Sequence, residues 1–365
     1  MIAWLRKLDP GLWSTLGVQV AAAASMFLMF LLAARLMPMD LYGSFSFGLS
    51  VGSVLALLCA LGHPNLVMRT VAQHSATGDH GLVKGICLYA TRRTLVAMFV
   101  TGLVLLILIL FAEGLRPELS TGLVFAMLVV VLYPLGVIRG SAARGLAAIP
   151  CGILPEEVVR PAVLVGLLAL AASFQVIDVR MSATLFAVAG VLSLAVGLWC
   201  LGHKLPFQWS IVSAEYHREK WRHASSKMLI GSVFQELLSR TDVIALGIVA
   251  SMSVTAQYTA AAKVVLISVF FLRVVDVLYA PRIAVAHARA DRVALGQAVR
   301  QSAQISFVAS LPLIVALLAV PELFLSAFGA EYVEAGVVLR ILALGQFVNA
   351  ATGSVGFALL MTGHE

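Results

Sequence analysis

The chain has 365 residues, of which 61% are hydrophobic and 12% are charged, and its mean hydropathy is +0.99. Soluble domains contain about 45–50% apolar and about 25% charged residues, so this composition excludes a soluble globular protein. The four cysteines lie in or beside apolar segments without CxxC spacing. We therefore expect them to be small core side chains rather than disulfides or metal ligands.

The apolar segments are long and continuous, and a helix needs about 20 apolar residues to cross a bilayer. Lipid offers the backbone no hydrogen bonds, so helices or closed barrels must form the spans. Without ten-residue alternation, helices are favoured over a barrel. The sequence therefore predicts an all-α polytopic membrane protein with about ten spans, at 12–36, 44–67, 86–111, 119–139, 150–174, 181–202, 228–250, 256–281, 303–327 and 337–361.

Lysine and arginine alternate between the two sides of the predicted spans, with 17 on one side and 4 on the other. This bias places the N-terminus in the cytoplasm. It also accounts for the net charge of +7, so the charge does not indicate nucleic-acid binding. A polar, basic segment divides six spans from four. The predicted domains are an N-terminal six-helix lobe at 1–202, a cytoplasmic basic linker at 203–227 and an incomplete C-terminal lobe at 228–365.

A weak internal repeat relates 41–74 to 257–287. Each segment begins near a tyrosine, crosses the membrane, reaches a proline and then an arginine, and ends in a histidine. Six spans separate the two segments, so they have the same orientation. The repeat predicts two parallel halves with a substrate site at their interface.

Three of the predicted spans, 150–174, 228–250 and 256–281, contain three charged residues each, and a charge at the bilayer centre costs about 2.5–3.5 kcal/mol. Arg240 is ~18 Å from the start of its span, near mid-bilayer, and it can pair with Glu236 four residues before it. Two interpretations stay open. The cations line a hydrated cavity that attracts a diphosphate, or acidic neighbours neutralise them and they hold helices together. The candidate substrate-binding cations are Arg240, Lys263, Arg273 and Arg160, and the candidate ion-coupling groups or charge partners are Asp242, Asp276, Glu236 and Glu156.

The segment ILPEEVVRPAVLVGLL places two glutamates and an arginine between two prolines. Glu156 and Arg160 are four residues apart and could pair inside a span that begins near Pro150. Alternatively, 161–177 spans the membrane alone and the charges lie at the cytoplasmic interface.

Several segments in this order resemble one family: LYGSFSFG with GHPNLVMRTVA, VIRGSAARG with VVRPAVL, SRTDVIALGIVASMSVTAQYTAA, and FGAEYVEAGVVLRILALGQFVNA. The family is that of the polysaccharide flippases, or O-antigen-type translocases, of the multidrug/oligosaccharidyl-lipid/polysaccharide exporter superfamily. The resemblance implies two pseudo-symmetric helical lobes around a central cavity and transport by alternating access. The implied substrate is an undecaprenyl-diphosphate-linked sugar repeat, moved across the bacterial inner membrane for surface polysaccharide such as lipopolysaccharide. Because the family has 12–14 spans, we expect the last two helices of the second lobe to be missing.

Two other functions remain as alternatives. A multidrug or metabolite cation antiporter should carry acidic residues in its first span, but that span has only Gln19 and Ser25 before Arg35. A membrane glycan polymerase or glycosyltransferase should have a larger outside loop than 112–118 or 328–336. We therefore expect a transporter rather than an enzyme, without cofactor or metal. Its expected partners are a lipid-linked oligosaccharide, the bilayer, a coupling proton or sodium ion and other polysaccharide assembly proteins.

Overall fold

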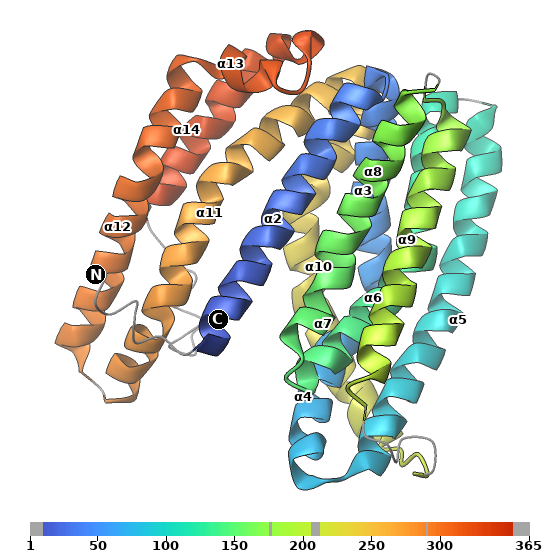
Figure 1. The fold of residues 1–365 in the computed structure, drawn as a ribbon, viewed down its shortest axis with the longest axis vertical. Coiled ribbons are helices and arrows are strands. Elements are labelled where there is room, and N and C mark those ends of the chain that lie inside the picture. Colours follow the sequence, from blue (N-terminus) through green and yellow to red (C-terminus); the bar gives the residue numbers. More distant parts are fainter. Residues whose placement is uncertain (1–9, 115, 175–176, 206–211, 290, 353–365) are drawn as a thin grey trace. The chain divides into compact units, whose positions relative to one another are not determined.

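The computed structural model describes residues 10–114, 116–174, 177–205, 212–289 and 291–352 (Figure 1). Its secondary structure in these ranges is helical. The chain forms two compact units, an N-terminal unit over Met1–Ala256 and a C-terminal unit over Gln257–Glu365. In the described ranges, eight helices are long and apolar enough to cross a membrane. The prediction of an all-α polytopic membrane protein is confirmed.

The helices of the N-terminal unit follow one another through short connections. They are α2 (Pro10–Leu36), α3 (Met39–Ala60), α4 (His63–Thr77), α5 (His80–Glu113), α6 (Pro117–Gly145), α7 (Ile149–Leu154), the π-helix η1 (Pro155–Val159), α8 (Arg160–Ala172), α9 (Val179–Gly202) and α10 (Arg218–Val249). The C-terminal unit contains most of α11 (Met252–Ala288), then α12 (Arg292–Ala319), α13 (Pro321–Ser326), the 3-10 helix η3 (Ala330–Ala335) and α14 (Gly336–Thr352).

Two of the ten predicted spans are helical but do not meet the criteria of length and apolarity for a membrane span. The predicted span 150–174 is divided by the π-helix between α7 and α8. The predicted span 228–250 lies in α10, whose charged residues lower its apolarity. Both segments are those in which the sequence places charges between apolar residues.

The core of the N-terminal unit forms where α3 packs against α6. A side chain at Gly48 would collide with the backbone of Gly122, so the two helices approach at small residues. Phe45 and Phe125 are fully buried beside this contact, and their rings meet edge to face with centroids 5.3 Å apart. Phe186 of α9 joins the cluster at 5.8 Å from Phe45.

The predicted span 44–67 is wrong at its C-terminal end, because α3 ends at Ala60. Leu61 and Gly62 both have left-handed backbone conformations, with φ of 52° and 71°. Glycine adopts this conformation without steric cost, so Gly62 allows the chain to turn directly into α4. The corresponding part of the internal repeat is the continuous helix α11.

Helix α10 belongs to the N-terminal unit, and it packs along α3 and α4. Arg116 donates hydrogen bonds to the carbonyls of Ile248 (2.8 Å) and Ala250 (3.3 Å) at the C-terminal end of α10. An arginine there satisfies free carbonyls and complements the helix dipole. The compact units therefore divide at 256/257, later in the chain than the predicted linker at 203–227, whose last ten residues already form the start of α10. The predicted lobe boundaries stay a prediction.

In the C-terminal unit, α12 packs against α14, and α13 and η3 cover their connection. Phe328 and Tyr332 are fully buried, with ring centroids 6.2 Å apart. Arg340 of α14 donates to the Leu318 carbonyl at 3.2 Å and pairs with Glu322 at 3.0 Å. The short elements between α12 and α14 are thereby held to both helices.

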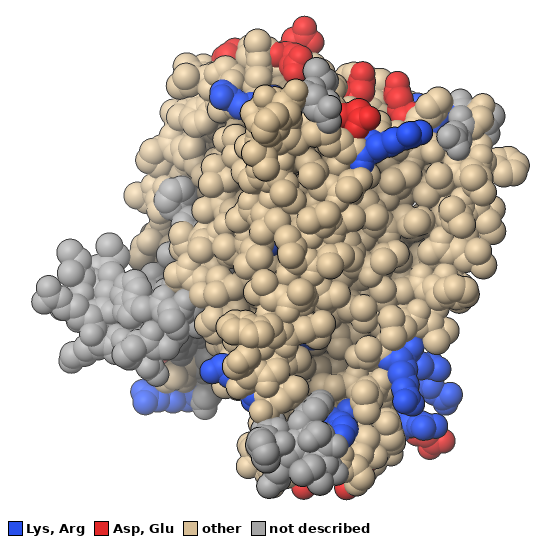
Figure 2. Space-filling view, turned by 45° about the vertical axis from the view of Figure 1, so that its right-hand side comes forward, with Lys and Arg blue, Asp and Glu red and all other residues tan. Residues whose placement is uncertain are grey.

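The surface of α5 shows how the protein meets lipid. From Thr94 to Phe111 this helix has no charged residue, and apolar side chains such as Phe99 and Phe111 are about three-quarters exposed, at 74% and 75%. Large exposed apolar surfaces of this kind require an apolar solvent. Figure 2 shows a face on which residues other than Lys, Arg, Asp and Glu form most of the surface.

Candidate functional site

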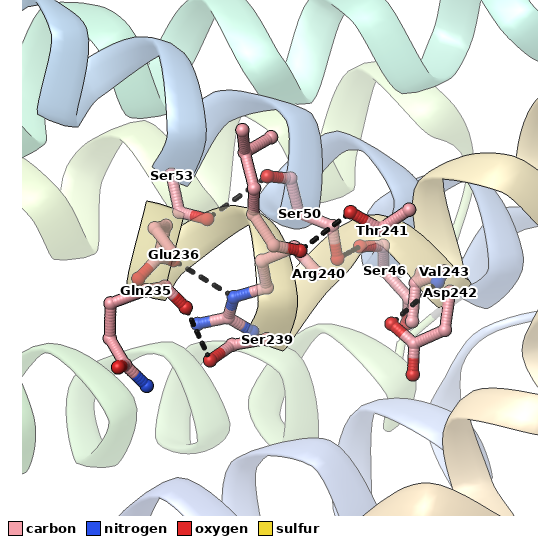
Figure 3. Close-up of polar contacts among 11 residues, drawn as sticks. Ser46, Ser50, Ser53, Gln235, Glu236, Ser239, Arg240, Thr241, Asp242 and Val243 are labelled. Carbon is pink, nitrogen blue, oxygen red and sulfur yellow. Dashed lines mark hydrogen bonds and ion pairs between the residues drawn. The ribbon is translucent and has the colours of Figure 1, made fainter. Parts of the chain in front are cut away.

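Helix α10 carries an ion pair inside a membrane protein. Arg240 Nε lies 3.0 Å from Glu236 Oε1, one helical turn earlier, as the spacing of four residues predicts. The side chains are 31% and 27% exposed, so both are partly withdrawn from solvent. Taking ~100° per residue, both lie on the same face of α10 as the buried residues Val243 and Gly247. The pair thus lies beside the packed face of the helix (Figure 3).

Helix α3 faces α10 with a row of hydroxyl groups. Ser46, Ser50 and Ser53 are spaced by four and three residues, which places them on one side of α3 (Figure 3). Ser50 Oγ donates to the Ser46 carbonyl at 2.9 Å, and Ser53 Oγ to the Ser50 carbonyl at 3.0 Å. These bonds satisfy the hydroxyl protons of Ser50 and Ser53, whereas the buried Ser46 hydroxyl has no hydrogen-bond partner among the described residues. The hydroxyl oxygens keep lone pairs that can accept further hydrogen bonds.

Asp242 lies apart from this pair on α10. Its carboxylate accepts a hydrogen bond from the Val243 N–H at 2.8 Å, and its side chain is exposed. Two residues rotate the helix by ~200°, so Asp242 and Arg240 face different sides (Figure 3). The sequence places Asp242 on a stripe with Gln235 and Ser239, and the exposure of all three agrees with that stripe.

The charges between the two prolines lie within the N-terminal unit, at the π-helix. Glu156 is 8% exposed, and its Oε1 lies 3.9 Å from Nη2 of Arg139 in α6. Arg160 instead stacks on Tyr133 of α6, with its guanidinium carbon 5.1 Å from the ring centroid. The ion pair of Glu156 is therefore with Arg139, whereas a pair with Arg160 is one of the two interpretations that the sequence leaves open. A cation over an aromatic face is attracted by the ring, and this contact orients Arg160 toward α6.

Arg139 supplies a hydrogen bond that Pro155 removes from the helix. Pro155 has no N–H, so the carbonyl of Cys151, four residues earlier, has no helical donor. Arg139 Nη1 donates to that carbonyl at 2.7 Å and to the Gly197 carbonyl of α9 at 3.1 Å. Ser193 of α9 donates its hydroxyl to the Pro155 carbonyl at 2.6 Å. Side chains of α6 and α9 thus satisfy backbone groups around the irregular helix.

Sequence reasoning missed Arg139. It is the last residue of the predicted span 119–139, but α6 continues to Gly145 and Arg139 is only 4% exposed. Two glycines leave room for this ion pair. A side chain at Gly197 would collide with the Arg139 guanidinium, and a side chain at Gly136 would collide with the Glu156 carboxylate. The run of small residues around Arg139 in GVIRGSAARG is the signal that could have indicated a packed helix.

The charged side chains of three elements, the π-helix, α8 and α10, act electrostatically on one phenol in α6. This polar cluster is defined as Tyr133, Glu156, Arg160, Glu236 and Arg240. The charges of Arg160, Glu157, Glu156 and Glu236 act on the Tyr133 phenol, and Arg240 joins the cluster through its ion pair with Glu236. Four of the eight predicted site residues therefore meet in the N-terminal unit.

The remaining predicted residues lie in α11. Lys263 is half-buried in the first half of that helix and makes an electrostatic or polar contact of its own. The side chains of Arg273 and Asp276 lie outside the described residues, so their predicted roles stay predictions. Within the part of the chain that the structure describes, no three His, Cys, Asp or Glu side chains gather as a metal site.

Comparison with known proteins shows the class of the fold. An inward-facing multidrug resistance MATE family transporter of the MOP superfamily has a TM-score of 0.72 at 14% identity, with 94% of this chain and 81% of that chain covered. An outward-facing structure of a multidrug resistance MATE family transporter has a TM-score of 0.56 at 14% identity, with 98% of this chain and 86% of that chain covered. A structure of MATE in the straight conformation has a TM-score of 0.58 at 13% identity, with 98% of this chain and 86% of that chain covered. The chain is thus a helical membrane protein with a MATE-like fold.

The family follows from the sequence match. A family model described as polysaccharide biosynthesis protein matches residues 10–287, while a search of curated proteins gave no match. The chain belongs to this polysaccharide biosynthesis family. The matched residues include α3, α6, α8 and α10, and therefore the whole polar cluster.

Proposed function

We propose that the protein translocates undecaprenyl-diphosphate-linked oligosaccharide repeat units across the bacterial inner membrane by alternating access. The observation that carries the proposal is the family match over residues 10–287. A membrane protein of a polysaccharide biosynthesis family is well placed to move a glycan intermediate that is attached to lipid. The MATE-like fold supports transport rather than synthesis as its part in that pathway.

The diphosphate is the part of this substrate that the cations would bind. Arg240 pairs with the carboxylate of Glu236, and an arginine fork can bind a phosphate by donating two parallel hydrogen bonds to its oxygens. A diphosphate brings more negative charge than Glu236, so it can compete for the guanidinium. Arg160, Lys263 and Arg273 are proposed as further cations along the path, and Asp242 and Asp276 as groups that accept a coupling proton or sodium ion.

The test uses cells deleted for the gene. Their undecaprenyl-linked lipids are extracted, and mass spectrometry determines whether a single sugar repeat unit accumulates. A protected-compartment assay then determines which leaflet holds it. We expect accumulation on the cytoplasmic face and loss of surface polysaccharide. Normal lipid-linked pools together with normal surface glycan would refute the proposal.

A second candidate is export of a drug or metabolite in exchange for a cation. The likeness to structures named as multidrug resistance MATE transporters favours it. Against it, α2 has no aspartate or glutamate from Pro10 to Leu36. This candidate predicts that the deletion raises drug sensitivity without changing lipid-linked pools, and that Asp242→Asn reproduces the sensitivity.

A further inference from the structure

A second cationic site lies in the N-terminal unit, apart from the polar cluster. Arg93 of α5 and Arg218 and Arg222 of α10 line a cavity of about 200 Å³ together with Tyr89 and Glu219. All three arginines are exposed, and none forms an ion pair with a carboxylate among the residues that the structure describes. Three cations against one acid leave the cavity with two excess positive charges, which suits an anionic ligand.

The cavity lies where α5 passes from polar to apolar surroundings. Arg93 is the last charged residue before the uncharged run from Thr94 to Phe111. That run has 18 residues, which extend ~27 Å as a helix and match a hydrocarbon core about 30 Å thick. Arg93 therefore lies at the level of the lipid headgroups of one leaflet.

Aromatic rings hold the two sides of the cavity together. The rings of Tyr89 in α5 and Trp221 in α10 have centroids 5.4 Å apart, and Trp221 is buried. Arg218 lies over the ring of Tyr216 at 5.2 Å. Tyrosine and tryptophan are typical of the membrane interface, where one end of the ring is apolar and the other is hydrated. The arginines are thus carried on a fixed framework at this level.

The direction of α10 adds to the positive field. Arg218 is its first residue, and the residue before it, His217, makes no side-chain cap to the free N–H groups of the first turn. The N-terminal end of a helix carries a partial positive charge that attracts anions. The three guanidinium groups and this end of α10 therefore act on the same cavity.

We propose that this cavity binds the phosphate of an anionic membrane phospholipid, whose acyl chains lie along the apolar surface of α5. Basic pockets between helices at the membrane surface are suited to such headgroups. The site is independent of the translocation proposed above. It would fix the N-terminal unit to the leaflet in which the basic ends of its helices lie.

The experiment measures phospholipid binding to the purified full chain in detergent by native mass spectrometry. Phosphatidylglycerol is titrated against phosphatidylcholine, because both carry a phosphate and only the first has a net negative charge. We expect a preference for phosphatidylglycerol in the wild type. Arg93→Gln and Arg222→Gln should each weaken phosphatidylglycerol binding about 5-fold. This factor corresponds to the loss of ~1 kcal/mol, the contribution of one cation near an anionic lipid surface.

Two neighbours provide matched controls. Arg92 precedes Arg93, and Lys220 lies between the two arginines of α10, but neither lines the cavity. Arg92→Gln and Lys220→Gln remove the same charge and should change binding less than 2-fold. Thermal unfolding of each variant verifies that the fold is retained, and a variant that unfolds is replaced by Arg93→Lys, which should keep most of the affinity.

Three results would overturn the proposal. The first is equal binding of both lipids by the wild type. The second is an equal loss in the control variants, which would mean a diffuse surface charge rather than a site. The third is displacement of phosphatidylglycerol by millimolar inorganic phosphate, which would make the ligand a free phosphate instead of a lipid.

Discussion

The carboxylate of Glu156 lies 3.9 Å from the guanidinium of Arg139, and both side chains are buried within the N-terminal unit. The same guanidinium also holds the carbonyls of Cys151 and Gly197. Arg139 thus connects α6 to α7 and α9, and Glu156 supplies the opposite charge. A buried cation with these three partners is a structural centre as well as a neighbour of the polar cluster.

Arg139→Ala should strongly destabilise the protein. Removing one partner of a buried ion pair leaves the other charge uncompensated and costs about 3–5 kcal/mol. The thermal unfolding midpoint in detergent should fall, whereas Arg180→Ala on the exposed start of α9 should leave it unchanged. The double variant Arg139→Met, Glu156→Met should recover part of the loss because no buried charge remains. A midpoint unchanged in Arg139→Ala would contradict this assignment.

Gly136→Ala should also be destabilising, because the new Cβ would collide with the Glu156 carboxylate. Overpacking of this kind costs about 1–3 kcal/mol. Gly166→Ala in α8 is the matched control, since apart from its chain neighbours and the backbone of its own helix no atom lies within 4 Å of its Cβ position. At that helical site alanine should be neutral or stabilising by roughly 0.5–1 kcal/mol. Equal midpoints for the two variants would show that the π-helix can move away.

Arg240→Ala should abolish surface polysaccharide in cells that carry it in place of the wild-type gene. The variant removes the only guanidinium that Glu236 holds in α10, and with it the proposed diphosphate contact. Arg240→Lys should retain partial activity if charge alone is required. Surface glycan is measured beside the amount of protein in the membrane. Loss of the protein itself would assign Arg240 a structural role instead.

Acid should destabilise the N-terminal unit through His63, which lies outside the eight candidate spans. Its side chain is 2% exposed, and burial with the charge of Arg93 lowers its pKa from 6.5 to about 4. Between these values the unfolded chain binds a proton that the folded chain does not. Stability therefore falls as the pH decreases from about 6.5 and stops falling below about 4, by on the order of 3 kcal/mol.

The measurement is the unfolding midpoint in detergent between pH 7.5 and 4.5. His63→Gln should flatten the dependence in this window, whereas His203→Gln, at an exposed position, should leave it as in the wild type. A slope retained in His63→Gln would assign the pH dependence to other groups.

Composition and apolar length were sufficient to predict a helical membrane protein, and spacing was sufficient for the Glu236–Arg240 pair. Both depend on local rules, since four residues complete about one helical turn. The break at Leu61–Gly62 could not be found in the same way. Apolar residues continue past it, and a single glycine within an apolar run does not by itself indicate a turn.

Arg139 was misplaced for a related reason. An arginine after an apolar run normally marks a helix end at the membrane surface, and its burial depends on carbonyls that other elements supply. Those carbonyls come from Cys151 and Gly197, the second of which is 58 residues away. Likewise, the assignment of Glu156 to Arg139 rather than Arg160 depends on the packing of α6 beside the π-helix.

The π-helix at Pro155–Val159 sets the angular phase of everything that follows it in α8. A π-turn takes one residue more than an α-turn, so each residue of α8 is rotated by ~100° relative to an uninterrupted α-helix. Deleting a single valine from this turn would rotate α8 back by ~100°, so Arg160 would turn away from Tyr133. The one additional residue in the π-helix therefore determines which side of α8 faces α6.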